Sequence, residues 1–297
     1  MVATRRLSDL VGTALQELQL PEGRLAVALS GGADSAALAF LANESGREVG
    51  LVHIDHQLIG SPALAQAAAE IAGKLGLDLE VFTVDLGSGP SLEERARDAR
   101  YRVLEGIESA VVTGHTRDDS VETMLINLIR GTGPRGLTGI PAFRPPNVHR
   151  PLLAITRSET REMATLAGLP FVDDPMNEDM SLTRNRVRLL ILPLLRELNP
   201  QLDSALARTA GTLASDIDFL DHLAASHQTG QLPASLVVTL PRALADRLLH
   251  AALVTAAIAP TADRIARMWS VASGDSQRQD LAEGRSVVRR GALLAIE

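Results

Sequence analysis

The sequence predicts an α/β protein, in which an open parallel sheet forms the first domain and a smaller, mostly helical domain follows. Short, continuously apolar runs alternate with amphipathic segments early in the chain, as parallel strands covered by helices on both faces do. A glycine-rich loop follows the first apolar run directly. An Asn-Pro pair at Asn199 then ends the alternation, and such pairs mark turns and boundaries.

The first domain is predicted to span residues 1–200. Its strands are the apolar runs at 25–29, 49–54, 79–84 and 110–113. Its helices are the segments of helical periodicity at 35–44, 63–75, 92–107, 118–130, 156–167 and 184–195. Ser91 and Thr156 each precede a glutamate by three residues, which predicts a capping box at two of these helices. Glycine and proline crowd residues 131–151, so an irregular loop is expected there.

The second domain is predicted to span residues 201–297. Its pattern begins with a long helix at 202–225 and a short strand at 235–239. Helices near 242–256 and 262–269 come next, and a pair of strands lies within 286–296.

Composition excludes several classes of chemistry. The chain has 297 residues, is 45% hydrophobic and contains no cysteine, which rules out disulfides, thiolate catalysis, iron–sulfur clusters and cysteine zinc sites. No apolar stretch reaches the length of a transmembrane helix, and the N-terminus lacks the apolar core of a signal peptide. A cytoplasmic protein without membrane attachment is therefore expected.

Positive charge is clustered although the net charge is −7. Residues 127–161 hold six arginines and a single acid, Glu159, while residues 184–196 hold four arginines and no acid. Lys74 is the only lysine, so the basic groups are almost all guanidinium, which binds phosphate and carboxylate in a fork. The net charge alone disfavours a nucleic-acid partner, but the clusters favour one.

The most informative motif is Ser-Gly-Gly-Ala-Asp-Ser at residues 30–35. It lies between a predicted buried strand and a helix, where adjacent glycines let the backbone approach a ligand and the helix N-terminus attracts anions. The motif lacks the Gly-Lys-Ser/Thr ending of a Walker loop and the glycine spacing of a dinucleotide fold. A phosphate-binding loop is predicted, and a plain glycine turn is the alternative.

Polar residues follow the second predicted strand as His53-Ile54-Asp55-His56. Ligands of open α/β sheets lie beyond the carboxyl ends of the strands, so His53 and Asp55 are expected to line a nucleotide pocket. Two alternatives stay open: simple polar capping of the strand end, and a zinc site.

Asp119 and Glu122 follow the fourth predicted strand, after His115. They are spaced one helical turn apart, opposite an apolar stripe that runs from Val121 to Ile129. They are interpreted either as surface acids favoured by the helix dipole or as a site for a cation, Mg²⁺ or an ammonium group.

Two arginine groups carry further hypotheses. Arg97 shares one helical face with Glu93 and Arg100, where surface ion pairs are the alternative to a ligand site. Arg184, Arg186 and Arg188 open a later helix together with Asn185 and suit a phosphate backbone or a carboxylate, with a solvated basic face as the alternative.

In sequence order, these motifs resemble those of the tRNA(Ile)-lysidine synthases, a family of PP-loop ATP pyrophosphatases. The resemblance runs from about Arg24 to Pro200, and the remainder is similar only in length and pattern. It rests on Ser-Gly-Gly-x-Asp-Ser, His-x-Asp-His at 53–56, Glu-x-x-x-Arg-x-x-Arg-Tyr at 93–101, Gly-His-x-x-Asp-Asp-x-x-Glu-Thr at 114–123, Arg-Gly-x-Gly-x-x-Gly-Leu at 130–137, Arg-Pro-Leu-Leu at 150–153, Asp-Pro-x-Asn at 174–177 and Arg-Asn-x-x-Arg at 184–188.

The resemblance implies a Rossmann-like PP-loop domain, a C-terminal domain that contacts tRNA, and a two-step reaction. ATP adenylates cytidine 34 of a CAU anticodon in isoleucine tRNA, and free L-lysine then displaces AMP to give lysidine. It assigns Asp34, Asp119 and Glu122 to catalysis, and Asp34 to Mg²⁺. Nucleotide contacts fall to Ser30, Gly31, Gly32, Ala33, Asp34, Ser35, His53, Asp55 and His115. Substrate contacts fall to Arg97, Asp119, Glu122, Arg184, Arg186 and Arg188.

Within that assignment, Asp119 and Glu122 receive the ammonium of lysine, Arg97 its carboxylate, and the residues at 184–188 the tRNA phosphates. The oligomeric state stays open, with a homodimer as one option. Related tRNA thiolases are disfavoured because they use cysteine. An ammonia-using amide or NAD synthetase is the second choice, and a nucleotide sensor without catalysis is the third.

Overall fold

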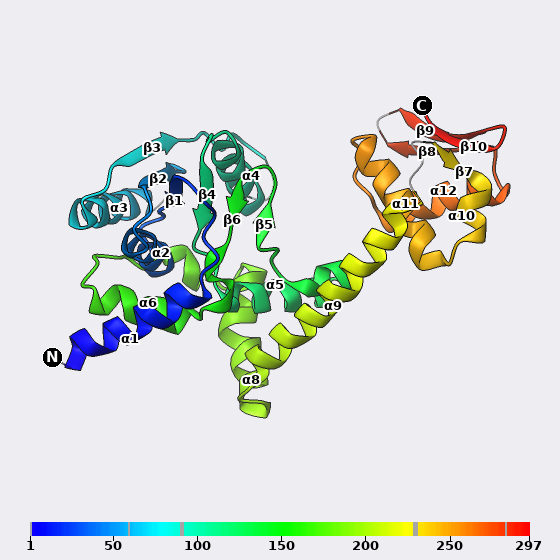
Figure 1. Ribbon diagram of the computed structural model, residues 1–297. Helices are drawn as coiled ribbons and strands as arrows, with labels where there is room; N and C mark the ends of the chain where they lie inside the picture. Colours follow the sequence, from blue (N-terminus) through cyan, green and yellow to red (C-terminus); the bar gives the residue numbers. More distant parts are fainter. Residues whose placement is uncertain (1, 59, 90–91, 228–230, 283) are drawn as a thin grey trace. The chain divides into compact units, whose positions relative to one another are not determined.

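The structure is a computed structural model that describes residues 2–58, 60–89, 92–227, 231–282 and 284–297. The chain forms two compact units, Met1–Ala210 and Gly211–Glu297 (Figure 1). The division lies inside one long helix, α9 (Leu202–Ala225), ten residues beyond the boundary that the Asn-Pro pair predicts. No helix of the described residues is both long and apolar enough to cross a membrane.

A six-stranded sheet forms the centre of the first unit, in the order β3-β2-β1-β4-β6-β5. All neighbouring strands are parallel except β5 and β6. The parallel α/β fold predicted from the alternating pattern is confirmed. The strands are β1 (Leu25–Ala28), β2 (Val49–Asp55), β3 (Leu79–Thr83), β4 (Ala110–Thr113), β5 (Phe143–Arg144) and β6 (Val148–His149).

The loop at residues 131–151, expected to be ordered but irregular, contains regular secondary structure. It holds a hairpin of β5 and β6, and two short 3₁₀ segments, η1 (Pro134–Thr138) and η2 (Pro151–Ala154). Strands of two residues are too short to show the alternation of apolar and polar residues typical of a strand. The sequence therefore shows only the glycines and prolines that indicate turns.

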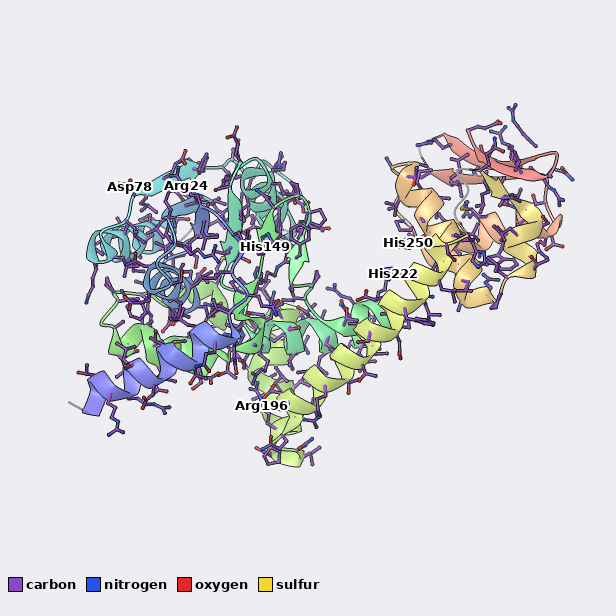
Figure 2. All side chains as sticks on the ribbon, in the orientation of Figure 1. Arg24, Asp78, His149, Arg196, His222 and His250 are labelled. Carbon is purple, nitrogen blue, oxygen red and sulfur yellow. The ribbon has the colours of Figure 1, made fainter. Side chains whose placement is uncertain are left out.

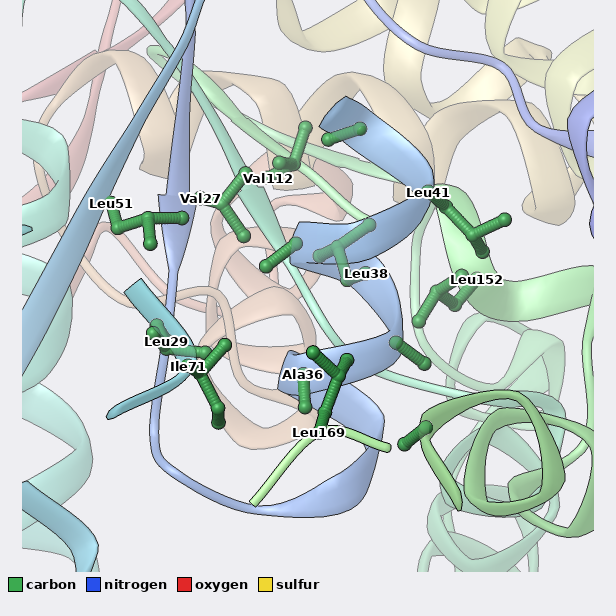
Figure 3. Packing of buried hydrophobic residues seen from close by; sticks show 14 of the residues in the cluster. Val27, Leu29, Ala36, Leu38, Leu41, Leu51, Ile71, Val112, Leu152 and Leu169 are labelled. Atoms are coloured by element: carbon green, nitrogen blue, oxygen red, sulfur yellow. The ribbon is translucent and has the colours of Figure 1, made fainter. Parts of the chain in front are cut away.

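Helices cover both faces of this sheet. The helices are α1 (Val2–Glu17), α2 (Ala33–Glu44), α3 (Ser61–Leu75), α4 (Leu92–Glu105), α5 (Arg117–Ile129), α6 (Arg157–Leu166), α7 (Thr183–Arg186) and α8 (Leu192–Leu198). Val27 and Leu29 face α2, α3 and α6 in the larger core cluster (Figure 3). Ala26 faces the opposite way, toward Tyr101 and Leu104 of α4.

Capping chemistry sets the start of α6. Thr156 and Glu159 form the predicted capping box: the Thr156 backbone N–H donates to Glu159 Oε2 at 2.8 Å, and the Glu159 N–H donates to Thr156 Oγ1 at 3.2 Å. The second predicted capping box begins at Ser91, which lies outside the described residues.

The apolar stripe predicted on α5 holds only for its first half. Val121, Met124 and Leu125 are buried, whereas Leu128 and Ile129 are more than half exposed. The helix enters the core at its N-terminus, where Glu122 on the other face is also buried, and it emerges toward its end. Side chains on both faces of the first turns of α5 are therefore buried. An amphipathic pattern predicts burial of one face only.

The second unit has its own core, built from α10 (Ala234–Thr239), α11 (Arg242–Thr255), α12 (Ala262–Ser273) and a small sheet. The strand predicted at 235–239 is wrong, because this segment forms α10. Ala234 and Val237 lie three residues apart and are fully buried together, so tertiary packing overrides the strand propensity of its valines. The sheet consists of β7 (Leu232–Pro233), β10 (Leu293–Ile296), β9 (Arg285–Arg290) and β8 (Arg278–Ala282), in that order.

Candidate active site

The loop at residues 30–35 closes on itself between β1 and α2. Ser35 Oγ donates to the Gly32 carbonyl at 2.9 Å and accepts from the Ser30 N–H at 3.1 Å. Ser30 Oγ lies 3.0 Å from Ser35 Oγ, which has already given its proton to Gly32. Ser35 thus supports the loop from inside, and both hydroxyls would have to turn before donating to a phosphate.

Two glycines make this loop possible. Gly31 has φ +90°, and a Cβ there would lie 2.4 Å from the Leu64 carbonyl oxygen of α3. Gly114, after β4, brings its backbone against the first turn of α2: a Cβ would lie 3.1 Å from both Asp34 C and Ser35 N. The end of β4 is therefore in direct contact with the first turn of α2, where the loop ends.

Asp34 occupies the first turn of α2 and points toward α6. Its Oδ1 accepts a hydrogen bond from the hydroxyl of the buried Thr160, and its Oδ2 lies 3.6 Å from Arg157 Nε. Burial raises the pKa of Asp34 to about 6, against the opposing effects of the Thr160 hydrogen bond and the Arg157 charge. Burial thus disfavours the charged carboxylate even beside Arg157, and a further cation would stabilise it.

Arg157 connects Asp34 to the acids of α5. Its Nη2 donates to Asp119 Oδ1 at 2.7 Å and its Nη1 to Glu122 Oε1 at 3.0 Å. Since Arg157 is the first residue of α6, the capping box that starts this helix also positions the guanidinium. The sequence pattern did not distinguish Arg157 or Thr160; its signals were the capping box at Thr156 and, for Arg157, the arginine cluster at residues 127–161.

Two more arginines reach the same acids from a helix that runs through α7, a π-helical segment η4 (Val187–Ile191) and α8. Arg184 Nε donates to Glu122 Oε2 at 2.8 Å, and Arg188 Nε donates to Glu122 Oε1 at 2.7 Å. The solvated basic face considered for this segment is wrong for these two residues, which turn inward because Glu122 is fully buried. Only Arg186 of the three is exposed.

The arginines hold both acids charged. Burial by itself would raise the pKa of Asp119, but Arg157 and Arg184 outweigh it and bring the pKa down to about 2. Burial acts the same way on Glu122, and the Arg188 hydrogen bond with the Arg157 and Arg184 charges lowers its pKa below the ordinary value. The surface-acid interpretation of this pair is therefore wrong, since Asp119 is 9% exposed and Glu122 0%.

The histidines near the strand ends have separate roles. The buried His53 donates from Nδ1 to the Leu29 carbonyl at 2.8 Å, joining β2 to the end of β1. Asp55 accepts the Gln57 N–H at 2.8 Å in a tight turn. Burial, followed by the Arg100 charge, lowers the pKa of His115 to about 3. His115 is therefore neutral, with its Nδ1 2.9 Å from Thr113 Oγ1.

The zinc interpretation gains no ligand set. Within the parts of the chain that the structure describes, no three His, Cys, Asp or Glu side chains gather as a metal site. Burial and the Arg100 charge lower the pKa of His56. Ile54 of β2 packs against the cluster that holds Tyr101 and Leu104, so α4 lies near the end of β2.

Arginines gather around Tyr101 of α4. The guanidinium carbons of Arg97 and Arg100 lie 5.8 and 5.5 Å from the centre of its ring, and Arg150 Nη2 donates to its hydroxyl at 2.9 Å. Burial and the charges of Arg97, Arg184 and Arg150 lower the pKa of Arg100. This concentration of positive charge suits an anionic ligand. The exposed Arg97 lies at its edge.

Comparison with known proteins identifies the family. Residues 3–195 match the PP-loop domain family. The tRNA(Ile)-lysidine synthase of Salinispora tropica is 43% identical over 79% of this chain and 77% of its own length, and that of Thermobifida fusca is 42% identical over 81% of each. The chain belongs to the tRNA(Ile)-lysidine synthase family. The family resemblance drawn from the motifs is confirmed.

A solved structure supports the fold. The U34-tRNA thiolase NcsA from Methanococcus maripaludis, solved with its [4Fe-4S] cluster, covers 70% of this chain and is covered over 79% of its own length. The TM-score is 0.56 and the identity 19%. This chain and the thiolase thus share a fold, but this chain has no cysteine for such a cluster.

Proposed function

We propose that this protein ligates free L-lysine to C2 of cytidine 34 in the CAU anticodon of isoleucine tRNA, using ATP. The observation that carries the proposal is the bridge made by Arg157, which links the acid of the PP-loop to the acid pair on α5. A nucleotide on the loop and an amine on the acid pair would then both lie next to Arg157. Membership of the lysidine synthase family supports the same chemistry.

The nucleotide would lie on the loop of Ser30, Gly31, Gly32, Ala33 and Ser35, at the N-terminus of α2. Asp34 fits a Mg²⁺ ion held mainly by ATP, since Mg²⁺ in such sites takes one or two carboxylates together with substrate phosphates. When bound, Mg²⁺ would neutralise charge on the departing pyrophosphate. The neutral His115 lies at the end of β4 beside the loop, and His53 and Asp55 lie at the end of β2.

In the first step, the cytidine O2 attacks the α-phosphorus of ATP, and the bond to the pyrophosphate oxygen breaks. The basic side chains at the site would bind the phosphates and stabilise the charge that develops on them. In the second step, the lysine ε-nitrogen attacks C2 and the C2–O bond to AMP breaks.

The attacking amine must be neutral, although the pKa of free lysine is about 10.4. Asp119 and Glu122 would bind the ammonium form and orient it, and a carboxylate at the site would take the proton as the C–N bond forms. Arg97, at the edge of the arginine cluster around Tyr101, would bind the lysine carboxylate. Holding both reactants in place is worth up to about 7–11 kcal/mol in favourable cases.

Contacts to tRNA phosphates are proposed for Arg186, which is exposed, and for the partly exposed side chains of Arg184 and Arg188. We also propose that the second unit, including residues 211–297, contacts the tRNA. The cytoplasm is the proposed location, because isoleucine tRNA is found there. A homodimer is proposed as the alternative to a monomer.

The test is direct. The protein is incubated with Mg²⁺, ATP, radiolabelled lysine and isoleucine tRNA with a CAU anticodon, and label in the RNA is measured. We expect stoichiometric incorporation, with one AMP per lysine, and none into a matched transcript carrying U34. ATP cleavage that depends on ammonia and needs no tRNA would instead favour the amide or NAD synthetase alternative.

A further inference from the structure

The acid pair has no free acceptor site for an incoming ammonium group. Asp119 Oδ2 accepts both the backbone N–H and the hydroxyl of Thr116, at 2.8 and 2.9 Å. Its Oδ1 accepts from Arg157 at 2.7 Å and from Arg184 at 3.2 Å. A carboxylate has about four lone-pair positions, and all those of Asp119 are occupied.

Glu122 is filled in the same way, entirely by arginine. Its Oε1 accepts from Arg157 at 3.0 Å and from Arg188 at 2.7 Å. Its Oε2 accepts from Arg184 at 2.8 Å and from Arg188 at 3.2 Å. A lysine ammonium can therefore reach these oxygens only by displacing a guanidinium.

Charge balance makes that displacement unfavourable in the free protein. Arg157, Arg184 and Arg188 bring three positive charges to two acids, and Asp34, whose Oδ2 lies 3.6 Å from Arg157 Nε, offsets the third. Adding an ammonium would leave excess positive charge in a site where the arginine side chains are 22 to 30% exposed. Uncompensated charge is costly in such surroundings. An anion must therefore bind to the arginines before the lysine ammonium can bind to the acids.

A nucleotide supplies that anion in the right place. Arg157 already reaches toward Asp34 in the first turn of α2, the helix whose N-terminus forms the phosphate-binding loop. Phosphate oxygens are as good partners for guanidinium as carboxylates are. The three arginines come from α6, α7 and η4, and each has a long side chain that can change partner without moving its helix.

We propose that nucleotide binding opens the lysine site, because its phosphates draw Arg157, and with it Arg184 or Arg188, away from Asp119 and Glu122. This inference rests on the proposed function, in which that acid pair receives lysine. The arginines are positioning residues: they close the amine site until the phosphates are in place. By linkage, bound lysine tightens nucleotide binding by the same factor.

The test measures lysine binding to the whole protein without tRNA, by equilibrium dialysis with radiolabelled lysine. One arm contains no nucleotide, and the other contains saturating Mg²⁺ and α,β-methylene-ATP, which cannot be cleaved at the reacting bond. We expect the lysine Kd to fall at least about tenfold with the nucleotide, within the 5- to 150-fold range usual for coupled sites. The same Kd in both arms, or no lysine binding in either, overturns the inference.

Variants identify the residues responsible. Arg157→Met should tighten lysine binding in the absence of nucleotide and reduce the coupling ratio to below about threefold, and Arg188→Met should act in the same direction. Arg196→Met is the matched control (Arg196 is labelled in Figure 2), because Arg196 pairs with the neighbouring Asp118 of α5 at 2.9 Å and not with the acid pair. A purely structural role would weaken binding in both arms and leave the ratio unchanged, so unchanged ratios in both variants contradict the inference.

Lysine incorporation into tRNA, measured on the same preparation, distinguishes failure of the inference from failure of the proposed function. Incorporation without coupling overturns only the inference. Absence of incorporation overturns the proposed function.

Discussion

Glu122 shows how much a single residue controls in this site. Its carboxylate is fully buried and contacts three guanidinium groups. Removing one partner from a buried ion pair costs about 3–5 kcal/mol, mainly because the other charge is left unpaired. If Glu122 were replaced, the charges left unpaired would be arginines, and these have phosphate as an alternative partner. A substitution at Glu122 can therefore affect lysine transfer without affecting adenylation.

We predict that Glu122→Gln raises the lysine KM by one to several orders of magnitude, since each factor of ten corresponds to about 1.4 kcal/mol of lost binding. Adenylation of the tRNA should largely survive, because the loop and the arginines proposed to bind the phosphates are all retained. Omitting lysine lets pyrophosphate release report the first step alone. If Glu122→Gln instead blocks pyrophosphate release and leaves the lysine KM unchanged, the acid pair serves the nucleotide or Mg²⁺.

The lowered pKa of Asp119 should make the free energy of unfolding depend on pH. The folded protein lowers its pKa from 3.8 to about 2, so the unfolded chain binds the proton more readily and folding is favoured when the group is charged. The contribution should be about 2 kcal/mol above pH 5 and shrink to about half by pH 3. Urea unfolding of the wild type and of Asp119→Asn, compared at each pH, measures it. A difference that is constant from pH 5 to 3 would contradict the pairing.

At the scale of elements, the site depends on close approach of backbones. β1 ends in a loop whose Gly31 meets α3, and β4 ends at Gly114 against α2. A parallel sheet brings these carboxyl ends to one edge, and glycine lets them touch there. The capping box of α6 then brings Arg157 to the same edge.

Gly31→Ala should lower the free energy of unfolding by about 1–3 kcal/mol or more and weaken ATP binding, because φ is positive and the new Cβ would meet a carbonyl oxygen at 2.4 Å. Gly73→Ala is the control: it lies inside α3, and nothing lies within 4 Å of its Cβ position. That change should be neutral or stabilise by about 0.5–1 kcal/mol. Urea denaturation and nucleotide titration of both variants test this, and equal effects would contradict the close approach at Gly31.

At the scale of the whole molecule, charge is distributed unevenly. The protein carries a net charge of −7, yet arginines collect at the carboxyl edge of the sheet. Several of those arginines are already paired with acids, which leaves fewer of them for RNA than the sequence count indicates. Binding of tRNA should therefore depend on exposed arginines such as Arg186.

Arg186→Ala should weaken tRNA binding and flatten its salt dependence by about 0.7–0.9 log unit of slope if one phosphate contact is lost. Arg24→Ala is the matched control, since this exposed arginine precedes β1 at the opposite edge of the sheet (Figure 2). Filter binding across a range of salt concentrations gives both slopes. An unchanged slope for Arg186→Ala would show that it does not contact phosphate.

The sequence by itself determined the parallel α/β fold and the family, because apolar runs, glycine spacing and motif order are local properties that need no partner. It also determined that the loop at residues 30–35 follows the first strand and that Asp119 and Glu122 follow the fourth, whereas the pairing of these two strands is seen only in the structure. It could not distinguish α10 from a strand, since burial of Ala234 and Val237 depends on the rest of the second core.

Only the tertiary structure decided which charges meet. Arg157, Arg184 and Arg188 lie 35, 62 and 66 positions from Glu122, and no pattern in a single sequence states that they converge on one buried carboxylate. Arg184 and Arg188, for which a solvated basic face was one alternative, therefore turn inward, while Arg186 between them is exposed. The physical reason is that burying an acid requires compensation in three dimensions, and folding selects the partners by distance in space.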